Sequence, residues 1–142
     1  MKNAIDIAKA FLKLSQPEAG DTISNLKLQK LLYYAQGFHL AIYEGKPLFE
    51  EDIIAWSYGP VVREVYDVFN EFGSGVIPVP DETIELTEQE KELVGEVWGV
   101  YGQFSALKLM EMTHEEMPWM TTERNSIISH EKLQEFFKDL VV

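Results

Sequence analysis

The sequence predicts a mainly α fold, a single compact helical domain of about five to six helices with a small two-stranded β element. Apolar residues recur at helical spacing in several separate segments, which is the primary sequence signal of amphipathic helices. Ser, Thr and Asn residues stand where these segments begin, and Gly or Pro where they end, as helix caps and breakers do. A chain of 142 residues that is 46% hydrophobic can fill one ordinary core. No internal repeat or linker is visible, so residues 1–142 are expected to form one domain.

Two helices are predicted in the first third of the chain. The first spans about residues 3–14 and ends at a break that contains Pro and Gly. The second begins after Ser24 or Asn25, both good N-caps, and ends at residues 44–47. Gly37 lies inside this helix, where it costs about 1 kcal/mol relative to Ala, so we expect another backbone to approach it closely. The strongest apolar stripe of the chain lies on the second helix and is expected to face the core: Leu28, Leu31, Leu32, Ala35, Phe38 and Ile42.

The middle of the chain is predicted to alternate between extended and helical segments. Residues 53–56 favour a short strand. Residues 76–80 contain two prolines that exclude a helix, and we expect them to pair with residues 53–56 as an edge strand. Between these two segments, the Gly59-Pro60 turn leads into a third helix over residues 61–72.

Three helices are predicted in the C-terminal half. Thr87 and Glu90 form a capping-box pattern that opens the fourth helix, and Gly102 ends it. Ser105 is the expected N-cap of the fifth helix. The last helix spans about residues 129–140.

Charge and composition exclude several classes of function. The formal net charge is −12, and affinity for nucleic acid comes largely from Lys and Arg, so direct binding to DNA or RNA is not expected. An anionic membrane surface is an equally poor partner, and no run approaches the roughly 20 apolar residues that span a bilayer. The chain has no Cys and no signal-peptide pattern, so we expect a cytoplasmic protein without disulfides.

The sequence predicts no catalytic residue, no metal site and no cofactor. His114 and Glu115 resemble the start of a zincin motif, but the second His is missing and Pro118 would break the helix that holds both ligands. Neither a Gly-x-Ser-x-Gly nucleophile elbow nor a Gly-rich phosphate loop is present. The acidic run over residues 81–96 is interpreted as a solvated face at a helix N-terminus. A metal-dependent hydrolase that uses His39 and His114 stays open as an alternative.

Aromatic residues in rigid settings favour an interaction surface instead. In the segment WSYGPVV at residues 56–62, Gly59 can adopt positive φ and Pro60 fixes φ, so Trp56 and Tyr58 are presented in fixed positions. Tyr and Trp combine an apolar body with a polar tip and are enriched at protein interfaces.

Further aromatic residues suit the same role. Pro118 predicts an extended conformation at Met117, which would hold Trp119 away from the preceding helix. Three more side chains are expected at the margin of the apolar stripe of the second helix: Tyr33, Tyr34 and His39.

Taken in order, several strings of this sequence resemble one known family. The strings are DIA at residues 6–8, LKLQKLLYYAQG at 26–37, AWSYGPVV at 55–62 with VY at 65–66, and TH at 113–114 with PW at 118–119. Together they resemble the SocA-like antitoxin domain, also called the Panacea domain and found in phage-associated GepA-like proteins. The resemblance covers nearly the whole chain, and the leucine-rich string and the Trp-x-Tyr-Gly-Pro-Val string are specific in combination.

This resemblance implies a protein-binding function. Family members are bacterial or prophage proteins, many encoded beside a toxin gene, and they neutralise a cognate toxin by direct binding. One member also delivers its toxin to a cytoplasmic protease, so a proteolytic adaptor is the alternative function. Members are not known as enzymes. The residues expected to line or support the partner-binding groove are Tyr34, His39, Trp56, Tyr58, Gly59, Pro60, Tyr66, His114 and Trp119.

Overall fold

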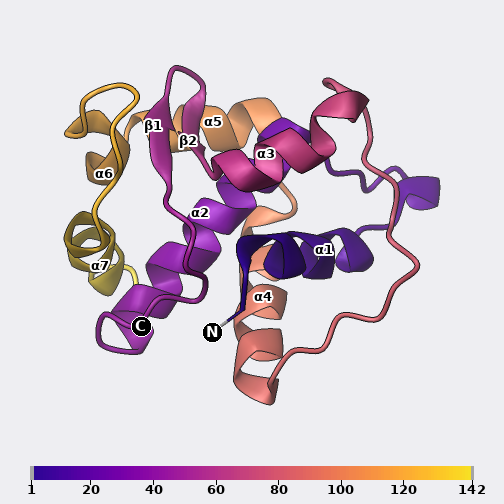
Figure 1. Ribbon diagram of the computed structural model, residues 1–142, viewed down its shortest axis with the longest axis horizontal. Helices are drawn as coiled ribbons and strands as arrows, with labels where there is room; N and C mark the ends of the chain where they lie inside the picture. Colours follow the sequence, from indigo (N-terminus) through magenta and orange to yellow (C-terminus); the bar gives the residue numbers. More distant parts are fainter. Residues whose placement is uncertain (1, 142) are drawn as a thin grey trace.

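The computed structural model describes residues 2–141. Within that range the chain forms seven α-helices, two short 3-10 helices and one two-stranded antiparallel sheet, which confirms the predicted fold class (Figure 1). None of the described helices combines the length and apolar character that crossing a bilayer requires. The elements follow in the order α1 (Ala4–Leu14), η1 (Pro17–Ala19), α2 (Asn25–Ile42), β1 (Ile54–Trp56), β2 (Gly59–Val61), α3 (Arg63–Phe69), η2 (Asn70–Phe72), α4 (Glu88–Tyr101), α5 (Ala106–His114), α6 (Met117–Met120) and α7 (His130–Lys138).

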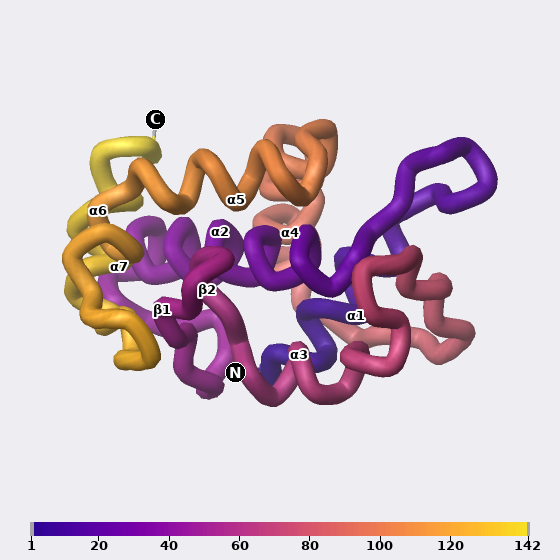
Figure 2. Tube along the Cα trace, turned by 90° about the horizontal axis from the view of Figure 1, so that it is seen from above, coloured from indigo at the N-terminus to yellow at the C-terminus, as the bar shows by residue number. Residues whose placement is uncertain are grey.

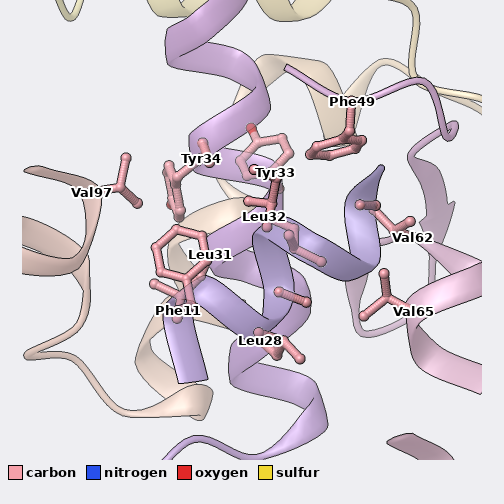
Figure 3. Packing of buried hydrophobic residues seen from close by; sticks show 14 of the residues in the cluster. Phe11, Leu28, Leu31, Leu32, Tyr33, Tyr34, Phe49, Val62, Val65 and Val97 are labelled. Atoms are coloured by element: carbon pink, nitrogen blue, oxygen red, sulfur yellow. The ribbon is translucent and has the colours of Figure 1, made fainter. Parts of the chain in front are cut away.

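Helix α2 is the centre of the molecule. It contacts α1, α3, α4, α5, α7 and β2, and it crosses the middle of the domain in both views (Figures 1 and 2). Leu31 is fully buried and Phe38 packs against the core, as predicted. Tyr33 and Tyr34 are fully buried as well, so the prediction that they lie at the margin of an apolar stripe is wrong. Other elements cover α2 on all sides, and Figure 3 shows some of the side chains that pack around it: Phe11, Phe49, Val62, Val65 and Val97.

Buried amide side chains of α2 bind backbone groups in the loop before the hairpin and directly after the hairpin. The Oε1 atom of Gln36 accepts the N–H of Leu48 at 2.7 Å, and its Nε2 donates to the carbonyl of Phe49 at 2.9 Å. Gln29 Oε1 accepts the N–H of Val62 at 2.8 Å. A buried backbone group without a partner is costly, so these bonds fix the extended chain against α2.

The sheet is a hairpin, and it differs from the predicted pairing. Strand β1 pairs with β2, with Trp56 opposite Gly59 across a two-residue turn. The prediction that residues 76–80 pair with β1 is wrong, because the N–H of Ile77 donates to the carbonyl of Ile23 at 2.9 Å instead. A two-residue connection brings β2 beside β1 at little entropic cost, whereas the distant segment requires a long loop to close.

Two helices begin or end differently from the sequence prediction. The third helix starts at Arg63 and not at residue 61, because Val61 still pairs within the hairpin. The expected extended conformation at Met117 is also wrong. Pro118 lies in the first turn of α6, where its missing N–H is harmless, and the extended residue is Glu116.

The helix starts agree well with the sequence. Each of the α-helices except α3 and the short α6 has a side chain that accepts a backbone N–H in its first turn, which satisfies a donor that the helix leaves free. The capping box of α4 is complete, since Thr87 and Glu90 bond each other's backbone N–H groups. The remaining N-caps are Asn3, Ser24, Ser105 and Ser129.

Gly37 lies where the side chain of Phe137 in α7 packs against α2. A Cβ at this position would overlap the ring of Phe137. The expectation of a neighbouring backbone is therefore wrong, and the neighbour is an aromatic side chain. That ring also packs edge-to-face on Tyr33 and Phe38, with centroid distances of 5.4 and 4.8 Å. The missing side chain of Gly37 thus makes room for the aromatic contact between the two helices.

Substitution of this glycine tests the packing. Gly37→Ala should lower the free energy of unfolding by up to about 2 kcal/mol, since an overpacking cost of about 1 to 3 kcal/mol outweighs the gain of about 1 kcal/mol in helix propensity. Urea denaturation monitored by circular dichroism measures the change. Gly99→Ala is the matched control, because Gly99 is exposed in α4 with no atom within 4 Å of the added Cβ, and it should stabilise the protein. Stabilisation by both substitutions would contradict the close approach of Phe137.

Candidate functional site

The β1–β2 turn projects from the domain and depends on a glycine with positive φ. Gly59 has φ +107°, and a Cβ there would lie 2.7 Å from Lys30 Cε and 2.9 Å from Thr113 Oγ1. Both the backbone conformation and the space therefore require glycine. Pro60 is buried beneath the turn, whereas Tyr58 at the tip is 69% exposed. The sequence prediction of a rigid turn that presents Tyr58 agrees with this geometry.

Three helices hold the hairpin in place. The indole N–H of Trp119 in α6 donates to the carbonyl of Trp56 at 2.8 Å. Lys30 Nζ in α2 donates to the carbonyl of Pro60 at 3.2 Å. The Trp56 ring lies edge-on to Tyr66 in α3, with centroids 5.1 Å apart. These contacts come from elements far apart in sequence, so the hairpin position depends on the tertiary fold.

The outer edge of β1 is covered by residues 125–128, which sequence reasoning missed. The N–H of Ala55 donates to the carbonyl of Ser126 at 3.0 Å, and the N–H of Asn125 donates to the carbonyl of Ala55 at 2.7 Å. Ile128 donates in turn to the carbonyl of Ile53 at 2.8 Å. This segment is short, and although Ile127 and Ile128 are β-prone, nothing local in the sequence indicates that it pairs with β1.

His114 is a packing group next to the hairpin. Its ring stacks on Trp119 with centroids 4.1 Å apart and planes 21° apart, and the guanidinium of Arg124 lies 3.6 Å from the Trp119 ring centroid. Burial lowers the pKa of His114, and the cations Lys30 and Arg124 add to this effect while the Ser57 carbonyl opposes it. The neutral imidazole is therefore favoured.

Lys30 is a buried cation beneath the Gly-Pro turn. Its relative exposure is 0%, and burial lowers its pKa to about 7. Within residues 2–141 the ion pairs are Lys9–Glu82 and Lys91–Glu88, so Lys30 has no carboxylate partner there. A charged ammonium without a counterion is costly to bury, and the neutral amine is favoured near and above neutral pH.

Glu116 links the buried tyrosines of α2 to the start of α6. Its carboxylate accepts the hydroxyls of Tyr33 and Tyr34 at 2.9 and 3.0 Å. Burial raises the pKa of Glu116 to about 7, although the two tyrosine hydrogen bonds act in the opposite direction. Tyr101 stacks on Tyr34 with centroids 3.9 Å apart. Tyr34 thus supports the α6 corner from inside and does not line an open groove.

The predicted site residues separate into two groups. Most of them surround the hairpin, but His39 lies near the end of α2, where its Nδ1 is 2.6 Å from the carbonyl oxygen of Lys46 and its ring packs on Tyr43. His39 and His114 therefore have different neighbours. In the described part of the chain, no group of three or more His, Asp or Glu side chains is placed to hold a metal ion.

An open apolar groove lies beside the hairpin, between α3 and α5 and over the start of α2. Its volume is about 560 Å³. Tyr58 and Leu107 are its most exposed large side chains, at 69% and 62%. Leu107 and Met110 were not predicted site residues, although α5 carries more apolar positions than one buried face can hold and only Leu109 of them is buried. The lining residues are Ser24, Asn25, Leu26, Gln29, Trp56, Tyr58, Val61, Tyr66, Gly73, Ser74, Ala106, Leu107 and Met110.

Comparison with known proteins identifies the class to which this fold and site belong. Residues 28–120 match the family model described as "Antitoxin SocA-like, Panacea domain", so the chain belongs to the SocA-like Panacea family. Among curated relatives, the chain is 46% identical to Antitoxin SocA of Caulobacter vibrioides (strain NA1000 / CB15N) over 67 residues, which are 46% of this chain and 35% of the relative. The matched region is thus about a third of the length of that relative. No solved structure matches. The family assignment supports an antitoxin role and suggests a non-enzymatic one.

Lys30 should make the stability of the protein depend on pH. The unfolded chain keeps this lysine protonated up to its ordinary pKa of 10.5, whereas the folded protein releases the proton near pH 7. Stability should therefore rise from pH 7 to 10.5 by up to about 1.4 kcal/mol per pH unit from this group. Lys30→Met should remove that part of the slope in urea denaturation between pH 7 and 10. The exposed Lys108→Met is the control and should leave the slope unchanged. Parallel wild-type and Lys30→Met profiles would contradict the buried, proton-free amine.

Proposed function

We propose that this protein is an antitoxin that neutralises a cognate toxin by direct binding, through the β1–β2 hairpin and the groove beside it. The observation that carries the proposal is the convergence of the family strings at one place. Lys30 from the leucine-rich string and Thr113 from the Thr-His pair both lie against Gly59, and Trp119 from the Pro-Trp pair bonds Trp56. Residues that are dispersed over the sequence thus support one projecting turn.

The chemistry of the groove supports a protein partner. Polar groups on its floor are already satisfied, since Asn25 donates to the carbonyl of Tyr66 at 3.1 Å and accepts from Gln29 at 2.9 Å. An apolar surface with paired amides loses little when water is excluded. Exposed aromatic side chains at such surfaces commonly contribute most of the binding free energy, and Tyr58 has that position. A toxin segment with an apolar face is the ligand that this groove suits.

A second candidate function is delivery of the toxin to a cytoplasmic protease. The observation that favours it is the exposed apolar pair that follows α7, Leu140 and Val141, with relative exposures of 42% and 41%. Toxin half-life in cells separates the two functions. Stoichiometric neutralisation leaves the half-life unchanged or longer when the antitoxin is co-expressed, and delivery to a protease shortens it.

Removal of the Tyr58 side chain tests the proposed toxin-binding surface. The cognate toxin is sought by co-expressing this protein with the product of the adjacent open reading frame and scoring the rescue of growth. Tyr58→Ala should keep the fold, because the side chain is mostly exposed, and should weaken toxin binding by about tenfold or more. Isothermal titration calorimetry measures the affinity, and growth rescue should weaken in parallel.

Val68→Ala is the matched control for this experiment. Val68 is also exposed on the surface, at 46%, but it does not line the hairpin groove. It should bind the toxin with wild-type affinity. Equal affinities for Tyr58→Ala, Val68→Ala and the wild type would show that the toxin binds elsewhere.

A further inference from the structure

A second apolar groove lies at the other end of α2 from the hairpin. It is formed by the last turns of α2, the outer side of α4 and the C-terminal tail, and its volume is about 630 Å³. Four of its apolar residues are exposed: Val100 at 52%, Leu140 at 42%, and Ile42 and Val141 at 41%. The residues that line it are Phe38, Ile42, Leu93, Glu96, Val97, Val100, Tyr101, Leu140 and Val141.

This second groove is separate from the hairpin groove. The two share no lining residue. Gln29 in the first groove and Phe38 in the second are roughly 14 Å apart along the axis of α2, at about 1.5 Å per residue. In Figure 1 the hairpin and α5 lie at the top of the molecule, whereas α4 and the C-terminal end of the chain lie towards the bottom. A partner in one groove therefore leaves the other open.

The side of α4 that borders the groove combines apolar and acidic positions. Leu93, Val97 and Val100 share one face of the helix and line the groove, but Leu93 and Val97 belong to the core at 4% and 3% exposure, so Val100 is the one of the three that a partner can cover. Glu96 lines the groove as well, and Glu92 lies one turn earlier on the adjoining face of α4. Neither carboxylate belongs to an ion pair within residues 2–141. The acidic run of the sequence thus ends as a charged border along an apolar surface.

The negative charge beside the groove disfavours a second copy of this chain as the occupant and favours a basic partner. A second copy of this chain would bring another −12 of net charge and would place its own Glu92 and Glu96 close to those of the first copy in a two-fold contact. Repulsion between like charges disfavours that arrangement. A partner with Lys or Arg beside an apolar face neutralises the same carboxylates and covers the same apolar side chains.

We propose that the second groove binds an amphipathic helix of another polypeptide, with its apolar face on Ile42 and Val100 and its basic side chains against Glu92 and Glu96. The groove is lined by helices and a tail and offers no free strand edge to extend, so a helix lying in a groove is the recognition mode that fits it. The proposal uses residues that the hairpin surface does not contain, and it stands or falls independently of the toxin-binding function.

A designed peptide tests this surface. The probe is a fluorescein-labelled helical peptide of about 18 residues, with Leu at positions i, i+3, i+4 and i+7 and Lys elsewhere, and its binding is followed by fluorescence anisotropy. Val100→Asp removes an apolar contact and adds a negative charge. Groove binding predicts that affinity falls by about tenfold or more, whereas simple attraction to an acidic protein predicts that it holds or rises. Val100→Ser removes the apolar contact without the charge and should also weaken binding. Circular dichroism checks that both variants are folded.

Two matched controls locate the site. Leu107→Asp makes the same kind of change in the hairpin groove and should leave peptide affinity unchanged. A peptide with Glu in place of Lys should bind at least about tenfold more weakly to the wild-type protein. Unchanged or tighter binding to Val100→Asp, equal binding of the Glu peptide, or no binding of the Lys peptide would each overturn the proposal. A concentration-dependent dimer in sedimentation that Val100→Asp abolishes would overturn it too and would assign the groove to a second copy.

Discussion

The burial of α2 on all of its sides is the constraint on which the rest of the structure depends. A helix that is covered all round must pair every polar side chain that it carries, because water does not reach it. Gln29 and Gln36 meet this requirement by bonding backbone groups directly after the hairpin and in the loop before it. Lys30 meets it only in part, with one bond to the carbonyl of Pro60. The polar residues of the central helix therefore determine where the projecting turn lies.

Two buried titratable groups, Glu116 and Lys30, make the stability of the protein depend on pH, one below pH 7 and the other above it. Burial raises the pKa of Glu116 from 4.5 to about 7, so its stabilising contribution is complete below pH 4.5 and is lost as the pH rises to 7. Burial lowers the pKa of Lys30 from 10.5 to about 7, so its contribution is complete above pH 10.5 and is lost as the pH falls to 7. Both groups are therefore at their least favourable near pH 7, and both lie where the hairpin and α6 meet α2. Functional sites commonly contain groups that destabilise the folded protein locally, and packing elsewhere in the structure compensates for this cost.

The helices of this fold could be predicted because their signals lie within a few residues. The site could not, because it depends on contacts between residues that are far apart in the sequence. The N-caps Ser24, Ser105 and Ser129 could be predicted because a cap acts within one turn. The pairing of β1 could not, since Gly59 and Pro60 are poor strand formers, whereas residues 76–80 contain three β-branched residues and are the more β-prone segment. Tyr34 and His39 belong to the same helix, yet one stacks in the core and the other bonds a loop carbonyl. Helical periodicity indicates one face of a helix and says nothing of the elements that cover the others.

The stacked pair Tyr34 and Tyr101 connects the two grooves through side-chain contacts, which raises the question of whether binding in one groove affects the other. Tyr101 lines the second groove and stacks on Tyr34, which bonds Glu116 at the start of α6, next to the tryptophan that holds the hairpin. Each link in this series is a close contact between buried or half-buried side chains, and close-packed interiors transmit strain but deform little. A partner that only covers exposed side chains at one end leaves these contacts unchanged. Energetic coupling between the two grooves would require Tyr101 or Glu116 to move, so binding at the two ends of α2 is expected to be close to additive as long as this cluster stays in place.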